Sequence, residues 1–399
     1  MKILLGVQYY EPAWAYGGPP KMATDLGRHL ARRGHDVTVC TTDALDAGER
    51  LPSGAAVLDG VRVMRFRNAS NTLAWRLKIL APLGMRGWLD AHVREFDVVH
   101  LFETRNMMNA WAARAAVDAG VPFVLSVWGS LPRGDGWRAI LKQRFDRRHA
   151  ATLFGRAAAL LAQNDHEASL YAGYGGDPAR VALWPLAVDP DEFAALPARG
   201  ALRASLGIGD EVPLVLFVGR INELKGLGPL IRSFARAGVP AAHLCIVGRD
   251  DGFLAAAQAL ARDEGVAGRV HFPGARYGRD AVAAYVDCDL FCITPTHFEE
   301  TSLASLSAAA CGRPILINDR CGVPWLDEYD AGVCVPHDEA AIARALGELL
   351  ADRARLGRMG QNARRMVSER FFLPRIVDQA ESIYRRACDE RTPAREASR

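Results

Sequence analysis

Residues 215–226 combine one strand with one basic loop and read Val215-Leu216-Phe217-Val218-Gly219-Arg220-Ile221-Asn222-Glu223-Leu224-Lys225-Gly226. The apolar run at 214–218, which is rich in β-branched residues, predicts a buried parallel strand. Apolar residues recur at helical spacing after Gly226, so Arg220 and Lys225 lie in a loop at the carboxyl end of that strand. Open α/β sheets bind ligands at this end, and both cations suit phosphate oxygens. Taken alone, the same segment is equally typical of a solvated basic loop.

A second segment, residues 295–314, predicts another device for holding an anion. It follows an apolar strand, and Thr301 and Ser302 are residue types that begin helices. Gly312 and Pro314 then end the helix of small residues between them. The backbone amides at the helix start, together with the helix dipole, suit a diphosphate, which the two cations of the first segment would help to hold.

The two segments together resemble the retaining glycosyltransferases of family 4, which have the GT-B fold. The family's Gly-Arg-x4-Lys-Gly element matches Gly219, Arg220, Lys225 and Gly226. Its Glu-x7-Glu element falls on Glu299 and Ser307, so the second glutamate is absent. The register is fixed by residues 310–314, which match the family's small-Gly-x-Pro ending. The resemblance extends from the first strand to about Tyr384.

The resemblance implies an α/β protein with two doubly wound, Rossmann-like lobes facing a cleft and a C-terminal helix that crosses back to the first lobe. It implies transfer of a sugar from a nucleotide donor with retention of configuration. By the resemblance, Arg220 and Lys225 stabilise the leaving diphosphate and Glu299 binds the donor sugar. The other donor-binding residues would be Gly219, Gly248, Glu300, Thr301, Ser302, Leu303 and Ser307. Family mechanisms use the leaving diphosphate as the base, so a catalytic carboxylate pair is not required. No metal and no cofactor is expected, because Arg220, Lys225 and the helix start take the place of a bridging cation.

The N-terminal half begins with a predicted βαβ unit whose first loop contains Gly17 and Gly18. Such a loop lets a ligand approach the backbone closely, although by itself it is also typical of a plain turn. In the resembling family, this glycine loop faces the donor diphosphate or the acceptor across the cleft.

Two later strands of this half carry further candidates for the first-lobe side of the cleft. His100 lies near the end of the strand at 96–102 and is either a cleft residue or a satisfied strand-end histidine. Trp128 and Gly129 follow the strand at 122–127, and the family often has histidine where Trp128 stands. A tryptophan can stack on a sugar and donate one hydrogen bond, but it neither accepts one nor titrates.

The residue types restrict the class of protein. A net charge of +3 over 399 residues argues against a dedicated nucleic-acid binder. The apolar run at the N-terminus is too short for a signal peptide. No apolar run in the sequence approaches the roughly 20 residues that a membrane span needs. The eight cysteines have no paired C-x2-C spacing and suggest reduced core residues in a cytoplasmic protein.

The domain boundary is predicted where Pro, Ala and Gly accumulate, close to Gly200. The first domain would cover residues 1–195 together with a crossing helix at 371–388. The second, nucleotide-sugar-binding domain would cover 200–370, leaving 389–399 as a disordered tail. Asp287 and Asp289 have the spacing of metal-binding carboxylates, but their place between a helix and a buried strand favours caps and salt bridges.

Partners follow partly from the resemblance and partly from charge. A UDP- or GDP-sugar is the expected donor, and the acceptor would be a glycan, a lipid-linked molecule or a small molecule. Residues 137–148, from Trp137 to Arg148, alternate apolar and basic side chains, as peripheral membrane helices do and as helices packed on their own sheet also do. Membrane contact would place the protein at the inner face of the membrane.

Two other functions remain open. The GT-B fold also serves nucleotide-sugar epimerases, which need no acceptor. Alternatively, Trp128 and Ser307 mark a degenerate chain that binds a complete transferase.

Overall fold

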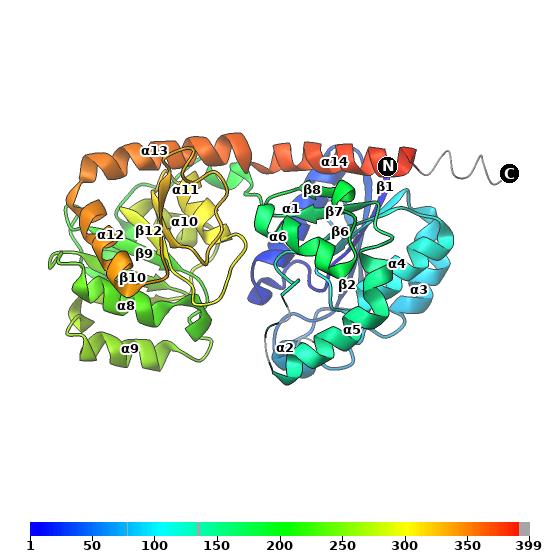
Figure 1. Cartoon of the computed structure of the whole chain (residues 1–399), viewed down its shortest axis with the longest axis horizontal. Helices are drawn as coiled ribbons and strands as arrows, with labels where there is room; N and C mark the ends of the chain where they lie inside the picture. Colours follow the sequence, from blue (N-terminus) through cyan, green and yellow to red (C-terminus); the bar gives the residue numbers. More distant parts are fainter. Residues whose placement is uncertain (78, 133, 135, 391–399) are drawn as a thin grey trace. The chain divides into compact units, whose positions relative to one another are not determined.

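The computed structural model describes residues 1–77, 79–132, 134 and 136–390, and the chain forms two compact units (Figure 1). The first unit consists of Met1–Leu186 and of the chain from Leu373 onward, and the second is Ala187–Phe372. This division lies before the predicted boundary near Gly200. Val188 pairs its backbone with Phe371 and Phe372, which joins the two ends of the second unit. Of the expected tail, residues 391–399 lie outside the described residues.

The first unit contains an eight-stranded sheet with the order β3-β4-β2-β1-β5-β6-β7-β8. All neighbouring strands are parallel except β3 and β4, which pair antiparallel at the edge. The strands are β1 Lys2–Gly6, β2 Asp36–Thr42, β3 Gly54–Leu58, β4 Val61–Phe66, β5 Val98–Phe102, β6 Phe123–Ser126, β7 Ala159–Ala162 and β8 Val181–Leu183.

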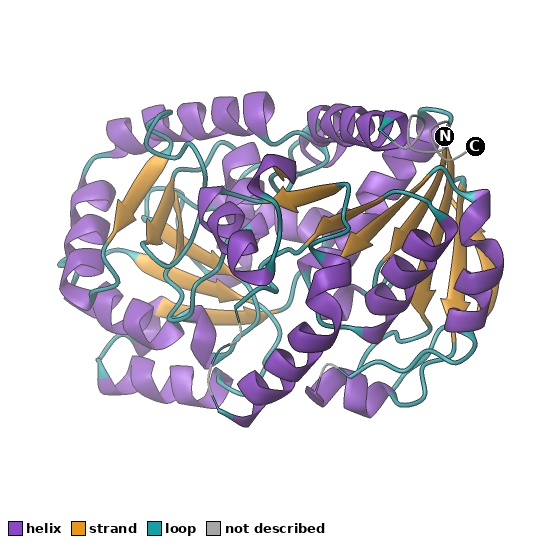
Figure 2. Ribbon diagram, turned by 45° about the vertical axis from the view of Figure 1, so that its right-hand side comes forward, coloured by secondary structure: helices purple, strands orange, loops and turns teal. Residues whose placement is uncertain are grey.

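Helices flank the strands of each sheet (Figure 2). Those of the first unit's N-terminal part are α1 Gly18–Arg32, α2 Asn71–Leu77, α3 Met85–His92, α4 Met107–Ala119, α5 Trp137–Leu153 and α6 Asp165–Leu170, with short 3-10 turns η1 Trp14–Tyr16, η2 Val93–Glu95, η3 Tyr171–Tyr174 and η4 Pro178–Arg180. Asparagine side chains cap α4 and α6, since Asn106 accepts from Asn109 N and Asn164 accepts from Glu167 N.

The C-terminal helix α14, Leu373–Asp389, packs on the first unit as expected. Its apolar face is buried, and its polar contacts reach three elements far away in sequence. Glu381 accepts from His35, Tyr384 contacts His100, and the Ile376 carbonyl accepts from the indole of Trp184. The crossing helix is therefore part of the first unit's core.

The second unit contains a six-stranded parallel sheet with the order β11-β10-β9-β12-β13-β14. Its strands are β9 Leu214–Val218, β10 His243–Val247, β11 Val270–Gly274, β12 Leu290–Ile293, β13 Ile315–Asn318 and β14 Gly332–Val335. The chain runs outward from β9 in one direction and resumes at β12 in the other, so the strand order reverses between β9 and β12. Open parallel sheets bind ligands at such a switch point.

The helices of the second unit are α7 Ala201–Leu206, α8 Leu227–Arg236, α9 Leu254–Asp263, α10 Gly278–Asp287, α11 Leu303–Ala310, α12 Glu339–Ala351 and α13 Arg353–Arg370, with η5 Pro190–Phe193, η6 Glu223–Lys225 and η7 Ala267–Arg269 as 3-10 turns. The two expected units and their doubly wound sheets are confirmed. Among the described helices of the chain, none is long and apolar enough to cross a membrane.

Candidate functional site

The loop after β9 is pressed against the end of β12 at the switch point of the second unit. Gly226 has φ of 72°, and a Cβ atom at this position would lie 1.8 Å from the carbonyl oxygen of Thr294. Only glycine fits there. Thr296 N also donates to the Leu224 carbonyl at 3.0 Å. These contacts bring the turn that carries Lys225 to the segment that carries Glu299.

Lys225 and Glu299 form an ion pair across the switch point. Lys225 Nζ lies 2.7 Å from Glu299 Oε2, and the two side chains are 21% and 24% exposed. Glu299 is held by its backbone as well, because its N–H donates to the Arg320 carbonyl and its carbonyl accepts from Gly322 N. The structure thus brings together two of the three residues expected to be catalytic.

Arg220 lies on the same loop but pairs with a different carboxylate. Its Nη1 atom lies 2.8 Å from Asp251 Oδ2, and half of the Arg220 side chain is exposed (50%). Asp251 follows β10, so this pair joins the loops after two neighbouring strands. Arg220 and Lys225 thus come from one loop and contact carboxylates on different sides of it.

Gly219 and Gly248 lie where these two loops touch. A Cβ atom on Gly248 would come within 1.7 Å of the Gly219 carbonyl oxygen. The backbone pairing of β9 with β10 continues past both strands, from Gly219 N to Val247 O and from Ile221 N to Arg249 O. The structure therefore explains Gly248 by close packing, which brings the loop after β10 to Arg220.

The start of α11 provides the expected amides. Ser302 Oγ accepts from Ser305 N, and the amides of Leu303 and Ala304 open the helix without an intrahelical acceptor. Glu300, Thr301 and Ser302 are all buried. The hydroxyl of Thr301 donates to the Glu300 carbonyl, and the hydroxyl of Ser302 accepts from Ser305 N.

Ser307 stands where the family has its second glutamate, and its side chain bonds to its own helix. Its hydroxyl donates to the Leu303 carbonyl at 3.0 Å, one turn earlier in α11. Burial raises the pKa of Tyr285, and a hydrogen bond with Ser307 opposes that rise. The hydroxyl of Ser307 is thus engaged within the second unit.

The carboxylates of Asp287 and Asp289 bond to residues 199–203, at the start of α7. Asp287 accepts from the amides of Gly200 at 2.5 Å, Leu202 at 2.6 Å and Arg203 at 3.1 Å, which caps α7. Asp289 pairs with Arg199 at 2.5 Å and with Arg203 at 2.8 Å. These are the cap and salt-bridge roles that the sequence favoured. Within the described residues, no cluster of three or more His, Cys, Asp or Glu side chains could hold a metal ion.

The first unit has its own switch point, between β1 and β5. The glycine loop follows β1, and α1 begins directly at Gly18, with Gly17 before it at φ of 97°. A Cβ on Gly17 would meet no atom within 4 Å, so the backbone angle rather than crowding requires glycine here. Tyr9 and Tyr16 stack beside the loop with ring centroids 3.5 Å apart.

The ends of β5 and β6 both hold a non-glycine residue in a left-handed conformation. Glu103 has φ of 64° and Trp128 has φ of 45°. The carboxamide of Asn109 supports the first of these by donating to the carbonyls of Phe102 and Glu103. Backbone strain of this kind gathers at functional sites.

Trp128 stacks on Phe102, with ring centroids 4.4 Å apart, and its indole Nε1 is buried without a hydrogen-bond partner among the described residues. Gly129 N donates to Glu167 Oε1, and Gln163 N donates to Glu167 Oε2. The fully buried carboxylate of Glu167 thus fixes the turn that carries Trp128.

His100 belongs to the core of the first unit and does not reach a surface. It is fully buried, with Nδ1 2.6 Å from Tyr384 Oη and Nε2 2.7 Å from Ser126 Oγ. Burial lowers the pKa of His100 to about 3, so the ring is neutral. The expectation of a cleft residue is corrected to the satisfied strand-end histidine.

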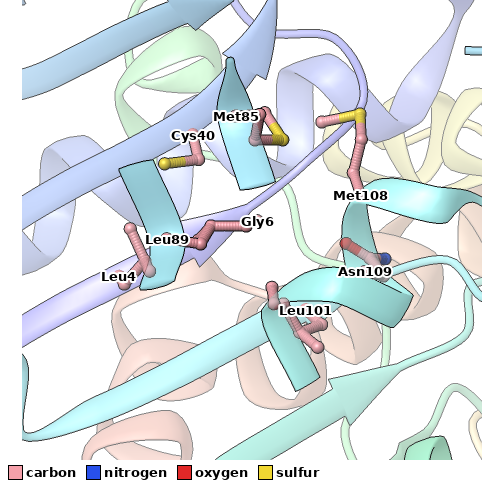
Figure 3. A pocket seen from close by; sticks show the side chains of 9 residues that line it. Leu4, Gly6, Cys40, Met85, Leu89, Leu101, Met108 and Asn109 are labelled. Carbon is pink, nitrogen blue, oxygen red and sulfur yellow. The ribbon is translucent and has the colours of Figure 1, made fainter. Parts of the chain in front are cut away.

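A small cavity in the first unit is too narrow to be a substrate site. It holds about 10 Å³, roughly the space of one water molecule. Figure 3 shows that its wall is mostly aliphatic and sulfur-containing side chains, among them Leu4, Cys40, Met85 and Met108.

Three residues of these sites were not singled out from the sequence. Asp251 lies in Arg249-Asp250-Asp251-Gly252, which reads as an ordinary turn, and Asn222 lies inside the basic loop itself. Glu103 follows a buried strand, but its left-handed backbone has no sequence signal.

Comparison with known proteins gives two family matches. The family described as "Glycosyl transferases group 1" matches residues 198–366, and the "Glycosyl transferase 4-like domain" matches residues 17–187. The two matches fall on the second and the first unit respectively.

Relatives of known name match nearly the whole chain. The D-inositol 3-phosphate glycosyltransferase of Xylanimonas cellulosilytica is 30% identical over 412 residues, which cover 95% of this chain and 94% of the relative. The enzyme of the same name from Gordonia bronchialis is 31% identical, covering 93% and 84%.

Solved structures share the fold. Sucrose-phosphate synthase from Thermosynechococcus elongatus superposes with a TM-score of 0.76 at 21% identity, over 96% of this chain and 98% of the other. Anabaena HepE in complex with UDP-glucose superposes with a TM-score of 0.73 at 20% identity, over 96% and 99%.

Proposed function

The chain belongs to the group 1 glycosyl transferases, retaining enzymes with the GT-B fold that transfer a sugar from a nucleotide donor, and on that basis we propose that it transfers a hexosyl group from a UDP- or GDP-sugar without a metal ion. The observation that supports the proposal is the arrangement at the β9–β12 switch point. There Arg220 and Lys225 lie on one loop, and the open amides of α11 follow the neighbouring strand.

Charge grows on the diphosphate as the bond to the sugar breaks, so fixed cations at that place lower the barrier directly. In the proposed reaction Arg220 and Lys225 bind the diphosphate, with the amides of Leu303 and Ala304. Glu299 binds hydroxyls of the donor sugar. The leaving diphosphate takes the proton of the acceptor hydroxyl, so the chain needs no carboxylate pair as acid and base.

The acceptor binds to the first unit in this proposal, near Gly17, Gly18 and Trp128. The indole N–H of Trp128 is buried without a partner among the described residues, so it can donate to a ligand oxygen only after a local rearrangement exposes it. A lipid-linked glycan, a polysaccharide precursor or a small molecule is the acceptor class. The name of the bacterial relatives makes D-inositol 3-phosphate the first compound to test.

We place the protein in the cytoplasm, in peripheral contact with the inner face of the membrane through residues 137–148. Ile140 and Leu141 on α5 are 57% and 48% exposed. The helix is fixed to the first unit by the ion pair of Arg105 with Asp146. The side chains of Trp137 and Arg138 lie outside the described residues.

The function is tested by incubating the protein with a panel of UDP- and GDP-sugars, with and without acceptors, and following products by mass spectrometry. Acceptor-dependent release of the nucleoside diphosphate supports transfer. Isomerisation of the donor without acceptor would identify an epimerase. Silence over a wide panel would favour a degenerate partner of another transferase.

Membrane contact is tested separately, by co-sedimentation with vesicles of phosphatidylcholine and phosphatidylglycerol. Ile140→Ser with Leu141→Ser should reduce binding, whereas Val57→Ser, at another exposed apolar position (71% exposed), should not. Equal binding of all three proteins would remove residues 137–148 as the contact.

A further inference from the structure

Asp251 contacts two side chains at the start of the basic loop, those of Arg220 and Asn222. Its Oδ2 atom accepts from Arg220 Nη1 at 2.8 Å and from Asn222 Nδ2 at 3.1 Å. One carboxylate oxygen therefore holds the guanidinium that is to bind the diphosphate and the amide two residues further on.

Asn222 carries this contact to the second cation. Its Oδ1 atom accepts from Lys225 N at 3.1 Å and caps the short turn η6. With the oxygen directed at that amide, the NH2 group of Asn222 is directed at Asp251, and both ends of the side chain are satisfied. Asp251 thus reaches Lys225 through one intermediate residue.

The backbone holds Asp251 in place independently of its side chain. Asp251 N donates to the Ile221 carbonyl at 3.0 Å, and Ile221 N donates to the Arg249 carbonyl at 2.8 Å. A change of the side chain alone therefore leaves the two loops joined. The ion pair itself is half-exposed on the arginine side, and pairs of this kind contribute little to stability.

We propose that Asp251 is a positioning residue for the transfer reaction, which fixes Arg220 directly and Lys225 through Asn222 before the donor binds. The proposal rests on the function proposed above. A guanidinium already held in place loses less conformational freedom when the diphosphate arrives, and such preorganisation increases affinity. It also keeps the cation where charge develops in the transition state.

The direction in which neutralisation of Asp251 changes anion affinity distinguishes a positioning role from a purely electrostatic one. Asp251 is negative and lies beside an anion site, so simple electrostatics predicts that its neutralisation tightens anion binding. Positioning predicts the opposite, because Arg220 then loses its anchor. Asp250 is the matched control, since it has the same charge one residue earlier, while its carboxylate accepts from the amides of Gly252, Phe253 and Leu254 instead.

The experiment is titration calorimetry of the full chain with inorganic pyrophosphate and with UDP. Asp251→Asn should weaken pyrophosphate binding by roughly tenfold, as expected for a lost charge-assisted hydrogen bond at a partly exposed site, whereas Asp250→Asn should bind as tightly as wild type or more tightly. In an Arg220→Gln background, Asp251→Asn should have a smaller effect than in wild type, because only the route to Lys225 through Asn222 remains. During turnover, Asp251→Asn should raise the donor KM and leave the acceptor KM unchanged, whereas a smaller folded fraction would lower kcat and leave both KM values unchanged.

Tighter binding by Asp251→Asn, equal effects of the two aspartate variants, or a full effect in the Arg220→Gln background would overturn the proposal. Wild-type protein that binds neither pyrophosphate nor UDP would overturn it together with the diphosphate site. Binding of pyrophosphate with the predicted pattern but no transfer to any acceptor would leave Asp251 as the anchor of Arg220 and remove only the proposed function.

Discussion

Nζ of Lys225 lies 2.7 Å from Oε2 of Glu299, and this contact joins the loops that follow β9 and β12. The cation assigned to the leaving group and the carboxylate assigned to the sugar therefore hold each other in the free protein. In the proposed reaction the donor must replace this ion pair by contacts of its own. The pair is partly exposed, so water screens it and the exchange is energetically accessible.

Replacement of Lys225 by alanine should mainly lower kcat, because the charge on the diphosphate grows as the bond breaks. Loss of one such contact typically costs roughly a hundred- to a thousandfold in rate. Steady-state kinetics measure the change, with Lys2→Ala as a control at an exposed lysine remote in sequence. A folded Lys225→Ala enzyme within threefold of wild type would show that Lys225 is only surface charge.

Activity should survive EDTA, because Arg220, Lys225 and the start of α11 do the work of a bridging cation. Asp287 and Asp289 are engaged in capping and ion pairs. The measurement is the initial rate after dialysis against EDTA, with manganese added back to one portion. A complete loss that manganese restores would contradict the prediction and move the chemistry to a metal site.

Substitution of Ser307 by glutamate should tighten binding of the donor nucleotide. In the family that the chain resembles, a glutamate at this position accepts hydrogen bonds from the ribose hydroxyls, and each charge-assisted bond is worth roughly 1.5–3 kcal/mol. Calorimetry with the ribonucleotide and its 2′-deoxy form, on both proteins, measures the effect. Strong discrimination against the deoxy form by wild type, with no gain in Ser307→Glu, would show that the ribose is recognised elsewhere.

Gly226→Ala should destabilise the second unit and abolish nucleotide binding, because a Cβ at this position would lie 1.8 Å from the Thr294 carbonyl oxygen. Gly238→Ala is the matched control, since Gly238 has the same φ of 72° but no atom within 4 Å of the added carbon. Its expected cost is about 1–2 kcal/mol for the left-handed backbone alone. Urea unfolding and UDP titration compare the two variants, and equal losses would mean that the contact with Thr294 has no role.

The neutral His100 should make stability depend on pH. Its pKa is about 3 in the folded protein, below the usual value of 6.5, so the unfolded chain binds more protons between these values. The free energy of unfolding should therefore fall as pH decreases from about 6.5 towards 3, by up to roughly 1.4 kcal/mol per unit from this residue. Urea unfolding at pH 7 and pH 5 should show a smaller difference for His100→Gln than for wild type. The half-buried surface residue His92, changed to Gln, should keep the wild-type difference.

The second unit could be predicted closely because its signals are local. Residues 214–218 were expected as a strand and form β9, and Gly226 was already placed at the end of the basic loop. The start of α11 follows the capping residue Ser302, as the sequence indicated. In each case the residues that determine the structure are neighbours in the chain.

Contacts between distant residues could not be predicted in the same way. His100 was left open between two roles because its partner Tyr384 lies 284 residues away, on a helix whose own pattern shows only an apolar face. Asp251 was missed because nothing in its turn indicates that Arg220 lies opposite. The pairing of Val188 with Phe371 likewise joins residues that are far apart in the sequence, and the composition near Gly200 does not indicate it.

Because α14 completes the first unit, the ribosome makes the two units in an interrupted order. The first 186 residues emerge early, yet their core lacks the helix that contributes Tyr384, Ile376 and Glu381 until the entire second unit has been synthesised. During that interval the ring of His100 and the indole of Trp184 have no helix to bond to. N-terminal domains generally fold first during synthesis. Here the second unit is the one that is continuous in sequence, so it can fold before the first. We expect a chain shortened before Leu373 to destabilise its N-terminal unit more than its C-terminal one.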